Sequence, residues 1–354
     1  MEISFEKATT LKKHPEDSAL GFGTYFTDHM FNMDYTPDQG WHNPRIEPYG
    51  PMELDPSTMV LHYGQAIFEG LKAYRTSSGD IQLFRPRDNF KRFNQSAHRL
   101  CMPPLDEEFV LNALQKLLII EKDWVPSEPG TSLYIRPAVI ATDPYVGLRS
   151  SYTYRFFIIL SPVGAYYPEG FDPVKIWVTS DYVRAVRGGV GQAKTAGNYA
   201  ASLYATELAN KEGYTQVMWL DGVELKYIEE VGSMNIFFMI DDEIITPQLN
   251  DSILSGVTRD SVIQLAGSWG KKVTERRISI DEVYRAHDDG KLQEVFGSGT
   301  AAVISPVGKI KYNTNEITVG DGNVGPFAAR LFQKLTDIQY GHAEDPFGWV
   351  VPVK

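Results

Sequence analysis

Residues 161–173, SPVGAYYPEGFDP, separate two halves of the sequence that each contain strand and helix patterns. Proline and glycine are dense in this stretch, and both interrupt regular secondary structure. The chain has 354 residues, which exceeds the length at which a single hydrophobic core usually stops growing. We therefore predict two domains, residues 1–164 and 174–354, joined by a linker at 165–173.

The half before the linker reads as strands alternating with helices. SLYIRPAVIA (132–141) and YRFFIIL (154–160) are predicted strands, and the second is a continuous apolar run suited to a strand covered on both sides. Residues 107–122 place apolar side chains on one helical face: Val110, Leu114, Leu117 and Leu118.

The half after the linker also mixes both types of element. Short apolar runs predict five strands: VKIWVTS, QVMWL, YIEEVG, SMNIFFMI and EIITP. Apolar spacing predicts helices at 200–212, where Gly213 is a stop signal, and at 258–269 and 327–339.

The composition excludes several classes of function. A formal charge of −11 disfavours nucleic acid and anionic membranes as partners, although a local basic cluster can still hold a small anion. The single cysteine, Cys101, excludes an intramolecular disulfide, and no cluster of residues has metal-ligand spacing. The polar N-terminus and the lack of a spanning apolar stretch favour a cytoplasmic protein.

The glycine-rich stretch RGGVGQAKTAGNY (187–199) is the strongest local signal for chemistry. It approaches a nucleotide-binding P-loop, but Ala193 stands where that loop needs its second glycine. A flexible loop with a solvated lysine is the plainer interpretation. The glycines also allow the backbone to present Lys194 inward, and a buried neutral lysine is a nucleophile suited to Schiff-base chemistry.

Three other stretches are candidate anion sites. SGVTRDS (255–261) places a glycine before a helix start, where N–H groups lack intrahelical partners. FGSGTA (296–301) is a turn of small residues, and FRPRDNFKRF (84–93) is a basic cluster in an acidic protein. Each also has an ordinary structural explanation, as a helix cap, a turn or a solvated helix face.

Seven motifs in order closely resemble the branched-chain aminotransferases of the fold-type IV pyridoxal-phosphate class, from about Phe22 to the C-terminus. They are LHYGQAIFEGLKAYR (61–75), FRPRDNFKRFNQSAHRL (84–100), SLYIRP (132–137), GGVGQAKTAGNY (188–199), EEVGSMNIF (229–237), SGVTRDS (255–261) and EVFGSGTAA (294–302). The resemblance implies an α+β fold, with a small α/β domain and a larger cofactor domain whose β-barrel-like core is flanked by helices.

The resemblance also assigns roles around pyridoxal phosphate. Lys194 would carry the cofactor as a Schiff base and move the Cα proton, and Glu230 would pair with the pyridinium nitrogen. Tyr199 would bind the 3-oxygen. The phosphate would be held by three groups: the Arg92 guanidinium, the Val257 and Thr258 backbone, and the Thr300 hydroxyl. Ser233 and the Thr300–Ala301 turn resemble the parts that receive the substrate α-carboxylate.

The implied reaction is transamination of leucine, isoleucine and valine with 2-oxoglutarate, which gives branched 2-oxo acids and glutamate. Phe22, Tyr134 and Tyr166 resemble walls of an apolar side-chain pocket. Arg136 resembles the arginine that meets the distal carboxylate of glutamate. Tyr63 resembles a residue that reaches in from a second subunit, so a homodimer is implied.

Two departures and three rivals accompany this interpretation. Ala302 and Ser305 replace a redox cysteine pair that some members carry, so no thiol switch is expected, and Ser233 stands where threonine is frequent. The same fold also serves D-amino-acid aminotransferases and aminodeoxychorismate lyases. The other rivals are a P-loop-like nucleotide-binding protein and a catalytically inactive homologue that acts as a binding module.

Overall fold

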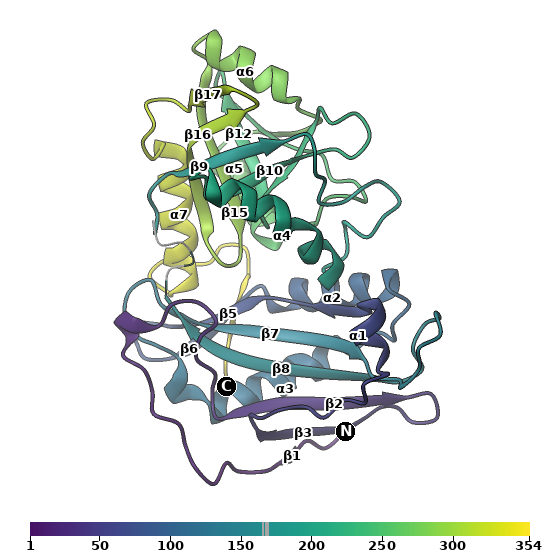
Figure 1. Cartoon of the computed structure of the whole chain (residues 1–354). Helices are drawn as coiled ribbons and strands as arrows, with labels where there is room; N and C mark the ends of the chain where they lie inside the picture. The colour runs from purple at the N-terminus through teal and green to yellow at the C-terminus, as the bar shows by residue number, and fades with distance from the viewer. Residues whose placement is uncertain (165, 167–169) are drawn as a thin grey trace. The chain divides into compact units, whose positions relative to one another are not determined.

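The computed structural model describes residues 1–164, 166 and 170–354, and the chain divides into two compact units (Figure 1). Unit 1 contains most of the first half of the chain together with two later segments: Met1–Tyr166, Ala193–Ala196 and Asp337–Lys354. Unit 2 contains the remainder: Tyr167–Gln192 and Gly197–Thr336. Residues 165 and 167–169 of the predicted linker lie outside the described residues.

The unit boundaries differ from the predicted domain ranges at the C-terminus. Residues 337–354 group with unit 1, because β18 (Val350–Pro352) pairs antiparallel with β6 (Ile81–Phe84). The Gln82 amide also donates to the carbonyl groups of Ile338 and Gln339, at 3.1 and 2.8 Å. The last segment therefore completes the sheet of unit 1.

Unit 1 is built on a nine-stranded sheet in the order β1-β3-β2-β8-β7-β5-β6-β18, with β4 paired to β7. The strands besides β6 and β18 are β1 (Ser4–Phe5), β2 (His29–Thr36), β3 (Gly40–Pro48), β4 (Ala66–Phe68), β5 (Leu71–Arg75), β7 (Ser132–Ala141) and β8 (Tyr154–Val163). Among the described strands of this sheet, only β1 and β3 run parallel. The predicted alternation of strands with helices is found only in part. The strands β2–β3, β4–β5–β6 and β7–β8 follow one another directly, while helices lie at 59–63 between β3 and β4, and at 86–99 and 107–120 between β6 and β7.

The helices of unit 1 are α1 (Met59–Tyr63), α2 (Pro86–Arg99) and α3 (Glu107–Ile120), with short 3-10 turns η1 (Asp17–Ala19) and η2 (Lys122–Trp124). The Asp106 side chain caps α3 by accepting from the Phe109 N–H at 3.0 Å. The four apolar residues predicted to share its face are all buried in a core that also includes Phe90 and Phe93 of α2.

Strand β7 positions two of the predicted pocket residues. Successive side chains of a strand point to opposite faces, so Leu133 and Ile135 enter the core while Tyr134 and Arg136 share the other face. Tyr134 is paired with Lys72 of β5 and with Ser161 of β8.

Unit 2 contains a second nine-stranded sheet in the order β11-β10-β9-β16-β15-β12-β13-β14, with β17 paired to β16. Its strands are β9 (Val174–Thr179), β10 (Gln216–Leu220), β11 (Ile228–Val231), β12 (Asn235–Ile240), β13 (Glu243–Thr246), β14 (Val273–Glu275), β15 (Leu292–Gly299), β16 (Val303–Tyr312) and β17 (Asn315–Thr318). All five strands predicted after the linker are present.

The remaining helices are α4 (Ala196–Lys211), α5 (Val257–Ser268), α6 (Ile280–Asp288) and α7 (Pro326–Gln339). Helix α4 begins four residues before the predicted start at 200, because Gly197 in its first turn is tolerated at a cost of only about 1 kcal/mol. Within the described residues, no helix has both the length and the apolar composition needed to cross a membrane.

Candidate active site

Lys194 lies in the short segment Ala193–Ala196, which is attached to unit 1 by hydrogen bonds on both sides of the lysine. The Lys194 carbonyl accepts from the Phe68 N–H of β4 at 3.0 Å, and the Lys194 N–H donates to Ser96 Oγ of α2 at 2.9 Å. The Thr195 hydroxyl donates to the Ala66 carbonyl at 2.8 Å. The backbone of the lysine is therefore fixed, and its side chain is half-buried.

The Phe68 ring connects this lysine to the predicted substrate pocket. Lys194 Nζ lies 5.0 Å from the centre of the ring, and the Arg136 guanidinium carbon lies 4.6 Å from the same centre. Arg136 Nη2 donates to Tyr134 Oη at 2.8 Å. Arg136 Nε is buried and makes no hydrogen bond within the described part of the chain. The arginine thus retains a buried donor beside the lysine.

Aromatic side chains extend the same region. The Phe22 ring lies 5.0 Å from that of Tyr134 and 4.9 Å from that of Tyr166, each in an edge-on arrangement. Gly70 is required here, because a Cβ atom at this position would lie 2.1 Å from Tyr134 Oη. Unit 1 therefore brings together the predicted nucleophile, the predicted pocket arginine and the three predicted aromatic walls.

A buried ion pair holds the predicted phosphate ligand. Arg92 of α2 contacts both oxygens of Glu69, at 2.7 and 2.9 Å, and the Glu69 side chain is fully buried. Asn89 and the Gly70 N–H donate to the same carboxylate, each at 3.0 Å. Burial opposes ionisation of Glu69, but Arg92 and then Lys194 outweigh it, so the pKa of Glu69 is lowered.

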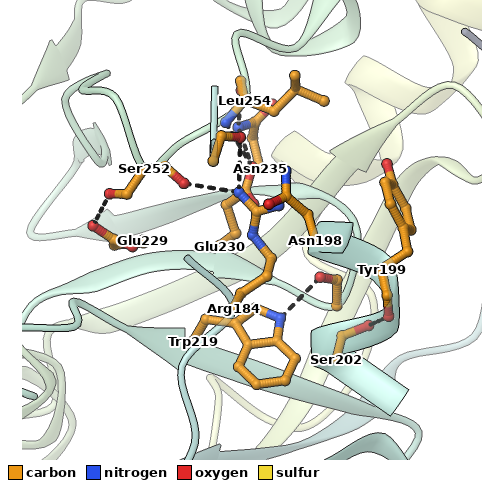
Figure 2. A network of polar contacts seen from close by, with 12 residues as sticks. Arg184, Asn198, Tyr199, Ser202, Trp219, Glu229, Glu230, Asn235, Ser252 and Leu254 are labelled. Carbon is orange, nitrogen blue, oxygen red and sulfur yellow. Dashed lines mark hydrogen bonds and ion pairs between the residues drawn. The ribbon is translucent and has the colours of Figure 1, made fainter. Parts of the chain in front are cut away.

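In unit 2, Glu230 of β11 lies in a polar network that also contains Arg184, Asn235 and Leu254 (Figure 2). Arg184 Nε contacts Glu230 Oε2 at 2.5 Å. The Leu254 N–H and Asn235 Nδ2 donate to Glu230 Oε1 at 3.2 and 3.4 Å. The carboxylate is therefore buried among donors, which stabilise its ionised form.

Helix α5 begins next to this network. Its N-cap, Gly256, provides no side chain to cap the first turn, so the N–H groups near Val257 and Thr258 form a potential anion site. A Cβ atom on Gly256 would lie 2.0 Å from Asn235 Oδ1. Since Asn235 also contacts Glu230, one side chain connects the carboxylate to the start of the helix.

The FGSGTA motif forms the end of β15 and the turn that follows it. Thr300 and Ala301 lie in this turn, and both are half-buried. Ser298 is paired with Asn235 across β15 and β12, and its Oγ is buried without a hydrogen bond among the described residues. A Cβ atom on Gly297 would lie 2.7 Å from the end of the Met234 side chain, which would have to shift.

Three predicted residues lie in other settings. Tyr199 is in the first turns of α4, where its carbonyl accepts from Ser202 Oγ at 2.7 Å (Figure 2). Ser233 is exposed in the turn between β11 and β12. Tyr63 ends α1 and is 40% exposed, and its hydroxyl donates to the Val146 carbonyl.

Sequence reasoning missed three residues of these networks. Glu69 and Asn235 lie inside quoted motifs, but their roles depend on partners that only the fold brings close. Arg184 lies outside every motif, and no local pattern marks it.

Comparison with known proteins identifies the family of the chain. Residues 66–310 match the family model for amino-transferase class IV. The chain is 59% identical over 352 residues to branched-chain-amino-acid transaminase 1 of Bacillus subtilis (strain 168), covering 99% of each. It also resembles the solved branched-chain amino acid aminotransferase of Escherichia coli, with a TM-score of 0.77 and 28% identity over 92% of this chain and 99% of that one.

A second solved structure is a T.th. branched-chain amino acid aminotransferase complexed with N-(5'-phosphopyridoxyl)-L-glutamate. It has a TM-score of 0.76 and 27% identity, over 95% of this chain and 99% of that one. These likenesses confirm the predicted α+β fold of the fold-type IV class. Because the family model covers most of the chain and the relatives match it from end to end, this chain belongs to the class IV aminotransferase family.

Proposed function

We propose that this enzyme transfers the amino group of leucine, isoleucine or valine to 2-oxoglutarate, with pyridoxal phosphate as its cofactor. The observation that carries the proposal is the placement of Lys194 and Arg136 on one Phe68 ring, beside the aromatic side chains around Phe22. The name of the 59% identical Bacillus subtilis relative supports the same substrate class. The relatives do not favour a D-amino-acid aminotransferase, an aminodeoxychorismate lyase or a nucleotide-binding protein.

The residues present fit pyridoxal phosphate. Gly256 gives α5 no side-chain cap, and the start of a helix is a favourable place for an anion. The Ser298 hydroxyl, which makes no hydrogen bond among the described residues, lies beside Asn235 as a buried polar atom that a polar ligand could satisfy. The T.th. relative is complexed with a phosphopyridoxyl adduct of glutamate, which supports this cofactor.

When bound, the cofactor supplies an electron-accepting ring that stabilises the charge left when the substrate loses its Cα proton. In this chain Lys194 would hold the cofactor covalently and then move the proton at Cα. Glu230 would hold a proton on the ring nitrogen, because its ionised form is stabilised by surrounding donors. Tyr199 would donate to the 3-oxygen.

Charged and oriented donors would bind the two anionic ends. Arg92 and the backbone of Val257 and Thr258 would hold the phosphate, with the Thr300 hydroxyl. The Thr300–Ala301 turn and Ser233 would receive the substrate α-carboxylate.

The side-chain pocket must accept both an aliphatic group and a distal carboxylate. The aromatic walls provide apolar contact for the first. Arg136 Nε, which is buried and makes no hydrogen bond among the described residues, provides a charged donor for the second. An apolar pocket with one arginine at its edge can therefore accept both an aliphatic side chain and a distal carboxylate.

We further propose that the enzyme works as a homodimer. Apolar side chains are exposed around α1 and the loop at 145–152 of unit 1: Leu61, Tyr63, Tyr145, Val146, Leu148 and Tyr152. Leu148 is 84% exposed, which is unusual for a leucine and supports contact with a second copy. Sedimentation equilibrium should give the mass of a dimer, and a monomeric mass would contradict this part.

The visible absorption spectrum of the purified protein tests the reaction. The band of the lysine-bound cofactor should bleach with L-leucine and return with 2-oxoglutarate. If leucine leaves the band unchanged but D-alanine bleaches it, the substrate is a D-amino acid and not a branched-chain L-amino acid. If no band forms even after pyridoxal phosphate is added, the assignment of pyridoxal phosphate as the cofactor is wrong.

A further inference from the structure

Arg184 forms a buried ion pair with Glu230. The two side chains are 9% and 4% exposed, and their contact is 2.5 Å long. The same guanidinium donates from Nη2 to the carbonyl groups of Ser252 and Gly191, at 2.8 and 3.3 Å, and Figure 2 shows the contact with Ser252. The arginine therefore contacts the carboxylate through Nε while the backbone holds it through Nη2.

The backbone that holds Arg184 is itself fixed. A Cβ atom on Gly191 would lie 2.3 Å from the Ser252 carbonyl oxygen, so the two segments touch there. The Ser252 N–H donates to Asn250 at 2.7 Å, and its hydroxyl donates to Glu229. A small shift of Arg184 would thus disturb several contacts, which keeps its Nε directed at Glu230.

A fixed cation at this position affects where a shared proton resides. A buried carboxylate favours its neutral form unless an opposite charge compensates for lost hydration. Coulomb repulsion falls with distance, so Arg184 disfavours a proton on Glu230, which it touches, more than a proton on a base beyond Glu230. With the arginine in place, a proton shared between Glu230 and a neighbouring base is therefore displaced toward the base.

We propose that Arg184 is a positioning residue that keeps Glu230 ionised and so keeps the shared proton on the ring nitrogen of the cofactor. This inference rests on the proposed function, which assigns Glu230 to that nitrogen. Arg184 acts only through Glu230.

The test reads the ring nitrogen directly. Wild type, Arg184→Gln, Arg184→Lys and Glu230→Gln are reconstituted with pyridoxal phosphate labelled with ¹⁵N in the ring, and the ¹⁵N chemical shift is recorded at neutral pH. The wild-type shift should be that of a protonated ring. In Arg184→Gln the ¹⁵N shift should move most of the way from the wild-type value to that of Glu230→Gln. In Arg184→Lys the shift should lie between the wild-type and Arg184→Gln values, because lysine keeps the charge but loses the second donor that contacts Ser252.

Turnover gives a second measurement. Arg184→Gln should lower kcat about 10- to 100-fold with little change in KM, because the loss falls on charge stabilisation in the transition state. The matched control is Arg277→Gln, which removes an arginine–glutamate contact of 2.6 Å to Glu224 on the surface of the same unit, where both side chains are more than 40% exposed. The control should match wild type in the ¹⁵N shift and in kcat.

A wild-type ¹⁵N shift in folded Arg184→Gln would overturn the proposal. If that variant does not fold, Arg184→Lys decides, since a wild-type shift in it would also overturn the role. Failure of the proposed function would give a different result, because the wild-type protein would then show no ¹⁵N signal from bound pyridoxal phosphate.

Discussion

Among the described residues, each unit contains an arginine–glutamate pair with both side chains buried, and different contacts hold the two pairs. In unit 1, Arg92, Asn89 and the Gly70 N–H all donate to the Glu69 carboxylate. In unit 2, the Leu254 N–H and Asn235 donate to Glu230, and Arg184 Nη2 also donates to backbone carbonyl groups. The same two side-chain types are therefore held in different surroundings.

The difference corresponds to the proposed roles. In each pair one member, Glu69 or Arg184, has no proposed contact with a ligand, and the other member does. Arg92 would meet an anionic phosphate and Glu230 a protonated ring nitrogen, so each pair presents the charge that its ligand requires. Removing a partner from a buried pair leaves an uncompensated charge, so Glu69 and Arg184 should both matter beyond packing.

The largest effect on turnover should follow loss of the Glu230 charge in unit 2. Glu230→Gln should lower kcat by roughly 100- to 1,000-fold, because the amide can no longer hold a proton on the ring nitrogen electrostatically. Cofactor affinity should change little. Steady-state kinetics together with cofactor titration would check both statements, and wild-type turnover would contradict the role of Glu230.

Arg136 sharpens the comparison, because this arginine has a buried Nε and no carboxylate partner among the described residues. Arg136→Met should lower kcat/KM for 2-oxoglutarate about 100-fold, since a charged distal group loses its partner in a buried site. The half-reaction with leucine should be affected far less. Single-turnover measurements of each half-reaction provide the test, and equal losses for both substrates would argue against selective recognition of the distal carboxylate.

A change in the Arg92–Glu69 pair of unit 1 should weaken the binding of the cofactor and leave turnover nearly unchanged. Arg92→Lys keeps the charge but loses the fork that contacts both oxygens of Glu69, so cofactor affinity should fall about tenfold. At saturating cofactor, kcat should stay close to wild type. Equilibrium titration of the cofactor-free protein measures the first quantity; unchanged affinity would remove Arg92 from the phosphate site.

The smallest effect concerns a buried cation of unit 1 that neither pair includes. Burial lowers the pKa of Lys72 from 10.5 to about 8. Above pH 8 the unfolded chain binds a proton that the folded chain has released, so stability rises with pH until about 10.5. Between pH 7 and 9 this contribution amounts to about 1 kcal/mol.

Lys72→Met should remove that rise. Urea unfolding of wild type and variant at pH 7 and pH 9 isolates the lysine, because the other titrating groups are common to both. The free energy of unfolding of wild type should rise by about 1 kcal/mol more than that of the variant over this interval. Parallel changes in the two proteins would mean that Lys72 does not titrate in this range.

Much of the fold could be predicted from local patterns. The strands after the linker and the buried face of α3 follow from apolar spacing, and the helix predicted at 327–339 became α7 with the same end. The attachment of residues 337–354 to unit 1 could not be predicted, because β18 pairs with a strand more than 260 residues earlier and carries no local sign of its partner.

The residues of the candidate site also fall into two groups, those that the sequence marked and those that only the fold reveals. The resemblance assigned roles to Lys194, Glu230 and Arg92, each of which lies inside a quoted motif, and those roles stay predictions. Glu69 and Arg184 could not be assigned, because each acts through a contact made by folding: Glu69 lies 23 residues from Arg92, and Arg184 reaches the carbonyl of Ser252 across 68 residues.

The most direct test of the central claim is to locate the lysine that carries the cofactor. Borohydride reduction of the reconstituted protein would fix the cofactor to that lysine, and mass spectrometry of the peptides would identify it. The account predicts quantitative modification of Lys194 and none of Lys72, the buried lysine whose lowered pKa makes it the chemical rival. Modification of Lys72, or of no lysine, would contradict the account.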